Sequence, residues 1–600
     1  MLTPHATTAW RQPLARPIAI SATELIPLRW AADFAQSRPL TLPASPWPLN
    51  SQDRVKRAAP PARPPTRRGA STVEGDTAGA QLKLVFLATL VLRFTGPAAL
   101  ASVVANAVGI AVLPRIVHAW LAVEAVFYIV CCGLARAMGA HSEPPPLSPL
   151  RRQRLWRRIL ADPGRGGSVA EFVGSWFYHD RGPPPIALVS QLLPRPLRRL
   201  LPRRAHQRPA AVMYDELSRE DVERWLSAGL FGKTREDINL DEARRLELSE
   251  IVGETERAAG RRLRDRSEAR SGTTQAVRPL LPQLDAVRWT ARPLVYYAVT
   301  HGFGSLVYSP RCMSAAGFGA RQAIASTDAG STLRYYVRAA APGREDAPPL
   351  LFVHGIGVGP APYADYLARL GEASGRMVVA VEMPAFSQRL SAPPPEPRRF
   401  AELVRELLAR HGHAEAHLSG HSMGSAYVSY VARYQPHTVA SLALLDPICL
   451  SMHNAAVTRA VVYPRADGIE EEVFNFFFKD ELLTSRVVAR HLWWYEAAQW
   501  LDDQTAERPT LVALSSDDAI VPSDAVAASW GCEGARARGV QLHQTPGKDH
   551  GEWLFDDVAL RSLVNATAHF TAAADEASFV RLADTQAATT AHGEASPANL

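Results

Sequence analysis

One serine between two glycines constrains this chain more than any other feature. The sequence Gly420-His421-Ser422-Met423-Gly424 follows a short apolar stretch and leads into a segment with helical character. Glycines on both sides of a serine suit a strand-to-helix turn that is too tight for side chains, and such a turn exposes the serine hydroxyl. A chain of this composition has roughly a 0.2 chance of containing one such match. The surrounding sequence must therefore show whether the match marks a nucleophilic serine or arose by chance.

From about residue 331 the chain alternates short apolar segments with amphipathic ones such as 398–410. The segments of strand length are 333–337, 350–353, 377–381, 416–419, 442–445, 510–514 and 540–543. Continuous apolar runs are typical of strands whose two faces are both buried in a parallel sheet. We therefore predict an α/β fold, with a mostly parallel sheet flanked by helices.

A glycine-rich loop follows the 350–353 segment, well before the serine. Its sequence is His354-Gly355-Ile356-Gly357. Backbone N–H groups in such a loop can point at an oxyanion that develops during acyl transfer. We predict the N–H groups of Ile356 and Met423 as the two oxyanion donors. His354 is interpreted as a side chain that braces the loop rather than as a catalyst.

Carboxylates follow the 510–514 segment, where an acid could orient a catalytic histidine. Asp518, two residues before Ile520, is the preferred acid. Asp517 is the alternative, and it would otherwise brace the loop through an Asx turn. Asp446 is a third candidate, for which we favour a structural role at a strand end before Pro447.

His550 lies in a loop after the last predicted strand, and it completes the chain order serine, aspartate, histidine. In acyl transfer, His550 would take the proton of Ser422 while Asp518 held the imidazole. The sequence therefore predicts Ser422, Asp518 and His550 as catalytic residues, with Gly355, Gly357, Gly420 and Gly424 as motif glycines. It predicts neither a metal nor a cofactor.

Together these motifs resemble the α/β-hydrolase superfamily, of the AB hydrolase-1 type, over about 165 to 570. More narrowly, the chain is similar to a eukaryotic group seen in fungi and algae. The matching stretches are ARPLVYY (291–297), AGF (316–318), PLLFVHGIGVGPAPY (349–363), VEMPAFSQRL (381–390), GHSMG (420–424), LDPI (445–448) and RHLWWYEAAQW (490–500). The resemblance implies an α/β-hydrolase fold with a helical cap, preceded by a helical pre-domain and an amino-terminal membrane hairpin.

Residues 84–137 are the most apolar part of the chain, and each half approaches the length of a membrane-spanning helix. Arg93 and Glu124 interrupt the two halves, and a charge at mid-span is costly unless it faces a partner. We predict a transmembrane hairpin, with a buried soluble hairpin as the alternative. Basic residues on both flanks predict that both ends, and the catalytic domain, lie on the cytoplasmic or equivalent face.

The predicted organisation has five parts. Residues 1–80 form a disordered basic tail, for which a transit sequence is the alternative. The other parts are the hairpin at 81–140, the helical pre-domain at 141–330, the hydrolase domain at 331–572 with a cap at 447–509, and a disordered tail at 573–600.

The composition argues against a nucleic-acid-binding protein, a zinc protein and a disulfide-rich protein. The net charge is +7, but the basic residues follow no nucleic-acid-binding motif, so nucleic acid is excluded as a partner. Five scattered cysteines lack both metal-ligand spacing and a disulfide pattern. With 47% hydrophobic residues, the chain is globular.

The predicted function is a membrane-associated serine hydrolase that cleaves or transfers the acyl groups of apolar or lipid esters, in an intracellular or organellar membrane. Its partners would be a small ester or lipid substrate, and the membrane through 84–137. The aromatic-rich cap would line an acyl pocket or form the cap's own core, and the sequence leaves this choice open. The alternative function is an inactive hydrolase-fold scaffold or binding protein at a membrane. Substrate identity and oligomeric state are not predicted.

Overall fold

The computed structural model describes residues 72–110, 113–138, 145–179, 212–265, 277–325, 332–464 and 468–593. Side chains are described between 82 and 576 within these ranges. Most of the predicted amino-terminal tail, up to residue 71, and its alternative as a transit sequence lie outside the described residues.

An eight-stranded sheet organises the α/β part of the chain, in the order β10-β9-β8-β7-β5-β6-β4-β3. The pairs from β10 to β6 are parallel, and β6-β4 and β4-β3 are antiparallel. The strands are β3 (Gln322–Ala325), β4 (Thr332–Arg338), β5 (Leu350–Val353), β6 (Val378–Glu382), β7 (Ala416–His421), β8 (Val439–Leu445), β9 (Thr510–Ser515) and β10 (Val540–Thr545). The predicted mostly parallel α/β sheet is confirmed. The prediction missed β3, which is an edge strand with three of its four residues exposed.

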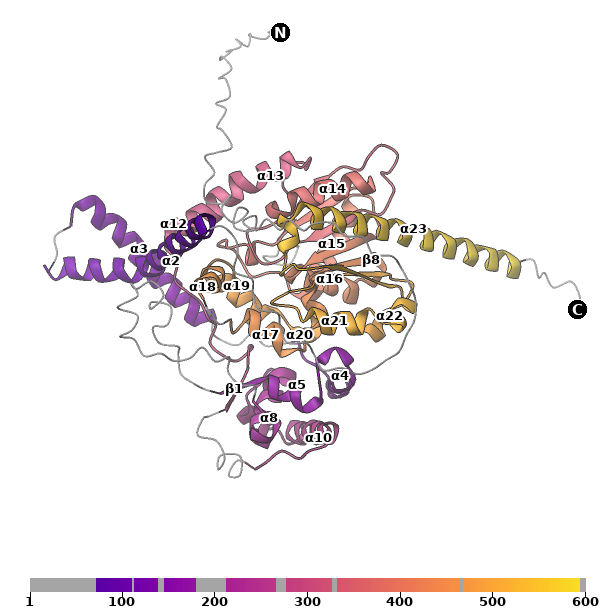
Figure 1. Ribbon diagram of the computed structural model, residues 1–600, viewed down its shortest axis with the longest axis horizontal. Helices are drawn as coiled ribbons and strands as arrows, with labels where there is room; N and C mark the ends of the chain where they lie inside the picture. The colour runs from indigo at the N-terminus through magenta and orange to yellow at the C-terminus, as the bar shows by residue number, and fades with distance from the viewer. Residues whose placement is uncertain are drawn as a thin grey trace, which may run out of the picture. The chain divides into compact units, whose positions relative to one another are not determined.

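Helices cover both faces of this sheet (Figure 1). On one face lie α15 (Pro397–Arg410) and α16 (Met423–Tyr434), whose apolar side chains belong to the larger core. On the other face, α14 (Ala364–Ser374) and α23 (Asp557–Gly593) share a second core. Two shorter helices, α21 (Ser523–Trp530) and α22 (Glu533–Ala537), accompany β9 and β10.

The disordered tail predicted from residue 573 is wrong as far as Gly593, because α23 continues to that residue. The stretch is rich in alanine, which has the highest intrinsic helix propensity, so a helix that starts on the sheet can continue through it.

The cap lies between β8 and β9. Its helices are α17 (Ala455–Val461), α18 (Ile469–Phe474), η10 (Asn475–Lys479), α19 (Leu482–Arg486), η11 (Val487–His491) and α20 (Trp494–Ala497). Trp493 and Tyr495 pack with Leu147, and Phe476 packs with Tyr296 and Tyr297. These aromatic side chains therefore form core packing, which is the second of the two roles that the sequence left open.

Preceding the sheet, α4 (Pro149–Ala161), α5 (Val169–Ser175), α8 (Arg219–Leu226), α9 (Arg235–Asn239) and α10 (Glu242–Ala259) form a helical region. Trp225 packs against Trp156, Phe172 and Trp176 at its centre. A short strand pair, β1 (Phe177–His179) and β2 (Val277–Pro279), lies beside these helices.

Two long helices, α2 (Thr72–Ala107) and α3 (Arg115–Met138), form an antiparallel hairpin beside α12 (Leu294–Tyr297) and α18 (Figure 1). Both are long and apolar enough to cross a membrane by length and composition. A π-helical segment, η5 (Ala298–Tyr308), continues α12 and leads into α13 (Ser309–Ala315).

Candidate active site

Ser422 occupies the sharp turn between β7 and α16. Its backbone φ is 52°, a left-handed value that costs a non-glycine residue energy unless the surrounding fold holds it. The Ser422 N–H donates to the Leu445 carbonyl at 3.0 Å, and the Ser422 carbonyl accepts from the Ser425 N–H at 3.0 Å. These bonds tie the turn to the end of β8 and to the first turn of α16.

The two motif glycines beside Ser422 have no room for a side chain. A Cβ atom on Gly420 would lie 2.5 Å from the Gly424 carbonyl oxygen, and one on Gly424 would lie 2.0 Å from the Val353 carbonyl oxygen. Because both obstacles are backbone atoms, no side-chain rotation can relieve them. Only glycine at these positions lets α16 approach β5 closely enough to form the turn.

Gly424→Ala is therefore expected to destabilise the protein by about 3 kcal/mol or more, because α16 would have to move away from β5. The measurement is the thermal unfolding temperature. Gly229→Ala, in η4 (Ser227–Phe231), is the matched control, since nothing lies within 4 Å of its added Cβ atom. An unfolding temperature for Gly424→Ala equal to that of the control would contradict the close packing.

His550 joins Ser422 to Asp518. Its Nε2 lies 2.8 Å from the Ser422 hydroxyl oxygen, and its Nδ1 lies 2.8 Å from Asp518 Oδ2. The other oxygen of Asp518 accepts the N–H groups of Ile520 and Val521 at 2.7 and 2.8 Å, and the side chain is fully buried. A carboxylate fixed in this way holds the Nδ1–H of the imidazole, which leaves Nε2 to accept a proton from the hydroxyl. The structure thus brings the three predicted residues together.

Asp517, the alternative acid, points elsewhere. It is exposed, and its carboxylate accepts from the Ser516 hydroxyl at 2.9 Å. The Asx-type turn predicted for Asp517 is wrong, because the carboxylate of Asp518 is the one that turns inward and reaches the N–H group two residues ahead.

Asp446, the third candidate acid, braces the end of the sheet. Its Oδ1 accepts from the Ser515 N–H at 2.7 Å, while its Oδ2 accepts from the Gly551 N–H at 2.9 Å and the Trp553 indole at 3.0 Å. Burial alone would raise the pKa of Asp446, but the neighbouring imidazoles of His421 and His550 and the Gly551 N–H lower it to about 2. A carboxylate with these bonds fixes the loop that carries His550, in keeping with the structural role favoured from the sequence.

The glycine-rich loop of the prediction lies against the serine turn. A Cβ atom on Gly355 would lie 3.0 Å from that of Ser422. Met423 is the first residue of α16, where an N–H has no acceptor within the helix. Among the described residues, the Ile356 N–H also has no hydrogen-bond acceptor. The Gly357 N–H donates to the Phe386 carbonyl at 3.1 Å, which holds the loop in place.

His354 is fully buried and braces the same loop. Its Nε2 accepts from the Met383 N–H at 3.0 Å, so its Nδ1–H donates to the Gly355 carbonyl at 2.6 Å. Burial lowers the pKa of His354 to about 4, and the imidazole is therefore neutral near pH 7. This geometry fits the bracing role that the sequence suggested.

A polar chain that the sequence did not reveal runs behind His550. The hydroxyl of Tyr363 accepts from the Gly355 N–H at 3.2 Å and lies 2.7 Å from Nδ1 of His421. The Nε2 of His421 faces Asp446 at 3.6 Å, and the rings of His421 and His550 lie 5.2 Å apart. The chain links the glycine-rich loop, the serine turn and the histidine loop. Tyr363 ends the matching stretch 349–363, which was the only signal in the sequence for its place here.

Asp446, Asp518 and His550 offer donor atoms within 4.8 Å of one another, a spacing that could hold a metal ion. Each of these atoms already has a hydrogen-bond partner in the contacts above. A cation there would have to break the bonds that hold His550 between Ser422 and Asp518. The donor set therefore fits proton transfer better than metal binding.

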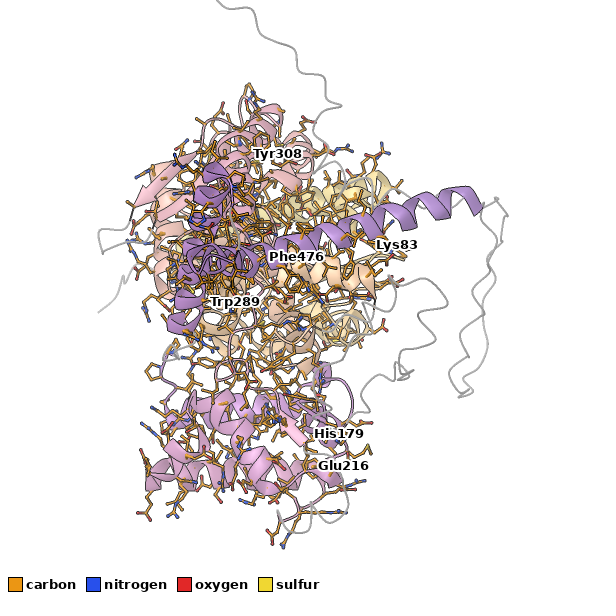
Figure 2. All side chains as sticks on the ribbon, turned by 90° about the vertical axis from the view of Figure 1, so that its left-hand side faces the viewer. Lys83, His179, Glu216, Trp289, Tyr308 and Phe476 are labelled. Atoms are coloured by element: carbon orange, nitrogen blue, oxygen red, sulfur yellow. The ribbon has the colours of Figure 1, made fainter. Side chains whose placement is uncertain are left out.

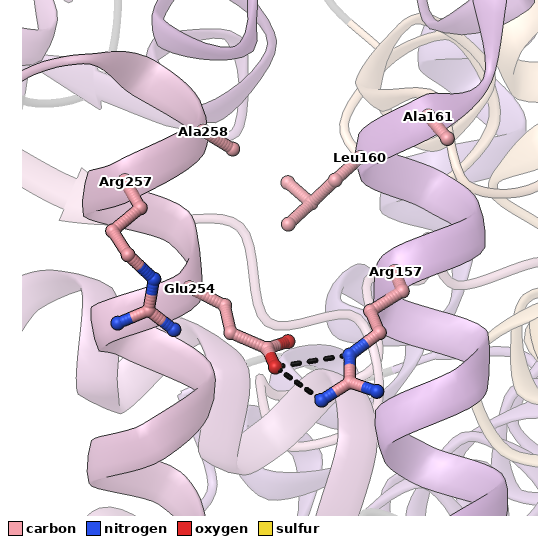
Figure 3. Close-up of a pocket in the computed structure, with 6 residues that line it drawn as sticks. All are labelled: Arg157, Leu160, Ala161, Glu254, Arg257 and Ala258. Carbon is pink, nitrogen blue, oxygen red and sulfur yellow. Dashed lines mark hydrogen bonds and ion pairs between the residues drawn. The ribbon is translucent and has the colours of Figure 1, made fainter.

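A shallow groove between α4 and α10 has no part in this site (Figure 3). Arg157 and Glu254 form an ion pair within it, and no predicted site residue lines it.

The family comparison agrees with this geometry. Residues 348–484 match the family model described as alpha/beta hydrolase fold, a range that includes the glycine-rich loop and Ser422. This part of the chain has the α/β-hydrolase fold. The narrower resemblance to a fungal and algal group remains a prediction.

Proteins similar to this chain share little sequence with it. A putative non-heme haloperoxidase of Mycobacterium phage D29 is 32% identical over 109 residues, which is 18% of this chain and 38% of the length of that protein. An esterase of Pyrobaculum calidifontis is 18% identical, with a TM-score of 0.34, over 46% of this chain and 92% of its own. A monoacylglycerol lipase of Paleococcus ferrophilus is 16% identical, with a TM-score of 0.29, over 40% of this chain and 99% of its own. Similarities at this level do not bear on the substrate.

Proposed function

We propose that this hydrolase is a membrane-associated serine hydrolase that cleaves, or transfers, the acyl groups of apolar or lipid esters. One observation carries the proposal: the His550 imidazole lies 2.8 Å from both the Ser422 hydroxyl and the Asp518 carboxylate, at a strained turn. Hydrogen bonds in this order activate a serine as a nucleophile and direct its proton to the imidazole.

In the proposed reaction, the Ser422 oxygen attacks the ester carbonyl while His550 Nε2 takes the hydroxyl proton. Asp518 stabilises the imidazolium that forms, and the N–H groups of Ile356 and Met423 hold the oxyanion of the tetrahedral intermediate. When this intermediate collapses, His550 gives its proton to the leaving alcohol, and Ser422 carries the acyl group. Water or a second alcohol then takes the acyl group from Ser422 by the same steps in reverse order.

The pH profile follows from the carboxylates around His550. Burial by itself would lower the pKa of His550, but the charges of Asp518, Asp446 and Asp549 outweigh burial and raise it above 6.5. A general base must be neutral, so kcat/KM should fall tenfold per pH unit below a pKa that exceeds 6.5. The measurement is kcat/KM for a soluble ester from pH 5 to 9. An acidic limb centred below pH 6.5 would contradict this assignment.

Support for the membrane part of the proposal comes from α2 and α3, which carry the length and apolar composition of membrane helices. An enzyme held at a membrane would meet lipid esters rather than polar metabolites. The proposal therefore favours substrates with long acyl chains over acetyl esters.

A series of p-nitrophenyl esters from acetyl to palmitoyl tests the proposal, with the full-length protein in lipid vesicles. We expect hydrolysis that rises with acyl-chain length and that is lost in Ser422→Ala. Hydrolysis that peaks at acetyl would overturn the preference for lipid esters. A folded protein that cleaves none of the series, and transfers no acyl group to an added alcohol, would favour the inactive scaffold.

A further inference from the structure

The hairpin holds two charged side chains within its apolar helices, and the hydrolase binds both. Arg93 of α2 forms an ion pair with Glu472 of α18, and its guanidinium carbon lies 5.2 Å from the centre of the Phe476 ring. Glu124 of α3 is buried, and its carboxylate accepts the Leu294 N–H at 2.9 Å. The two charges that interrupt the apolar pattern therefore face protein and not lipid.

Apolar contacts surround these two polar ones. The ring of Phe127 on α3 meets the ring of Tyr297 edge to face at 5.7 Å. Leu92 and Phe127 pack on a buried cluster of Tyr296, Tyr297 and Phe476. Figure 2 looks onto this side of the molecule, with Phe476 beside α2 and with Lys83 farther along that helix. One side of the hairpin is thus docked on α12 and the cap near the middle of both helices.

The opposite side of the hairpin is apolar and exposed along its length. On α2 the exposed side chains follow one another at spacings of three and four residues, which places them on one side of the helix. The exposed apolar side chains include Leu84, Leu87, Val91 and Phe94 of α2, and Ile116, Trp120, Val123, Val126 and Val130 of α3. This side runs past the docked middle of the hairpin, so it is not confined to the tip.

The segment formed by α12 and η5 adds a third apolar strip beside the hairpin. Val295, Val299, Phe303 and Leu306 are between 39% and 68% exposed, and they lie four, four and three residues apart on one side. No Asp, Glu, Lys or Arg occurs between Arg292 and Arg311.

The docked contacts conflict with a hairpin that crosses the bilayer. At 1.5 Å per residue, Arg93 lies about 15 Å along α2 from Lys83 and about 21 Å from Ala107. A crossing hairpin would therefore place Arg93 near the middle of a hydrocarbon layer about 30 Å thick. Its partner Glu472 would lie there too, together with the exposed side chains of Glu470 and Glu471. Charged groups at that depth are strongly unfavourable.

We propose that the α2–α3 hairpin and η5 lie along one leaflet of a membrane as a single apolar platform, and that the hairpin does not cross the bilayer. The docked side, with Arg93 and Glu124, faces the hydrolase, and the exposed side enters the lipid. This inference rests on the membrane association proposed above, and it replaces the predicted transmembrane arrangement.

Charges at the ends of the helices suit this orientation. Lys83, Arg115 and Arg136 lie near the ends of the apolar stretches. In a hairpin that lies along the surface, their long side chains can all reach the lipid head groups of the same leaflet. The orientation also places the cap next to the lipid that would supply the substrate.

A cysteine in the hairpin turn distinguishes one leaflet from two. Gly109 lies in this turn, and no atom lies within 4 Å of an added Cβ. Its φ of 76° strains a residue with a side chain, so hydrolysis of a soluble ester first checks that the variant folds. Full-length Gly109→Cys protein in sealed phosphatidylcholine–phosphatidylserine vesicles, with the hydrolase on the outside, is treated with a membrane-impermeant maleimide. The treatment is repeated after a pore-forming peptide opens the vesicles, and the parent chain corrects for native cysteines. We expect equal labelling of Cys at 109 before and after opening. Labelling that rises several-fold on opening would show that the hairpin crosses, and would overturn the proposal.

A matched pair of substitutions tests the part played by η5. Leu306→Glu should lower the fraction of protein that floats with the same vesicles at least about tenfold, because it puts a charge into the apolar platform. Leu240→Glu, on an 88% exposed leucine before α10, should change flotation less than twofold. Hydrolysis of a soluble ester without vesicles checks that both variants fold. Equal flotation of the two variants would remove η5 from the platform and overturn the proposal.

Flotation of the parent chain with vesicles shows whether a negative result contradicts the one-leaflet arrangement alone or membrane association as well. A parent chain that floats but fails the Gly109 test remains membrane-associated, so only the one-leaflet arrangement is lost. If the parent chain does not float and sediments as a dimer, a second copy covers the apolar side, and both membrane proposals fail. Acyl transfer through Ser422 would stand in either case, since the soluble ester measures it separately.

Discussion

Ser422→Ala should lower kcat/KM for ester hydrolysis by about 10⁴-fold or more. The substitution removes the only oxygen that lies within hydrogen-bond distance of His550 Nε2 among the described residues, so no acyl-enzyme can form. Residual activity would come from the oxyanion donors and from substrate binding alone. The measurement is the initial rate on the best ester of the chain-length series.

The control for Ser422→Ala is its stability. Alanine tolerates the positive φ at this position about as poorly as serine, so the unfolding temperature should stay close to that of the parent. An activity loss of less than about tenfold in a folded variant would contradict the role of Ser422 as nucleophile.

Asp518→Asn is expected to have the next largest effect, a loss of about 10³- to 10⁴-fold in kcat. An amide presents an N–H as well as an oxygen, and it removes the charge that stabilises the imidazolium. If the amide oxygen of the asparagine accepts from the Ile520 and Val521 N–H groups, the amide NH₂ faces His550 Nδ1. The NH₂ then donates to Nδ1 and favours the tautomer whose Nε2 carries the hydrogen, which cannot accept the Ser422 proton. The loss should appear in kcat more than in KM, because the carboxylate does not contact the substrate.

Asp517→Asn is the matched control, since it makes the same chemical change one residue earlier on an exposed side chain. We expect a change of less than about threefold in kcat. If Asp517→Asn lost activity as severely as Asp518→Asn, any change in this loop would impair the enzyme. The assignment of Asp518 as the catalytic acid would then fail. An active Asp518→Asn enzyme would point to Asp446 as the acid.

Local patterns in the sequence were sufficient for the sheet and for the order of the site residues. Strands β5 to β9 are buried on both faces, and such strands are largely apolar, so they could be predicted without any tertiary information. The Ser422 turn could be predicted because backbone atoms crowd its two flanking glycines, so that no residue with a Cβ atom fits there. Edge strand β3 was missed, because only one of its four side chains is buried.

The sequence alone did not predict which side chains of distant segments contact one another. Two adjacent acids, Asp517 and Asp518, fit the same pattern, and only the fold of the loop turns one toward His550. The partners of Glu124 and Arg93 lie far along the chain, Leu294 being 170 residues from Glu124. Both charged side chains of the apolar helices therefore have partners in the rest of the protein, and these partners are the basis of the proposed one-leaflet arrangement.

The most direct test of the account is the intact mass of the folded, full-length protein after reaction with a fluorophosphonate, which modifies an activated serine. The account predicts a single adduct, mapped to Ser422 by peptide sequencing, and no adduct in Ser422→Ala. A folded parent protein that stays unmodified, or one whose adduct lies on another residue, would contradict the central claim that His550 and Asp518 make Ser422 a nucleophile.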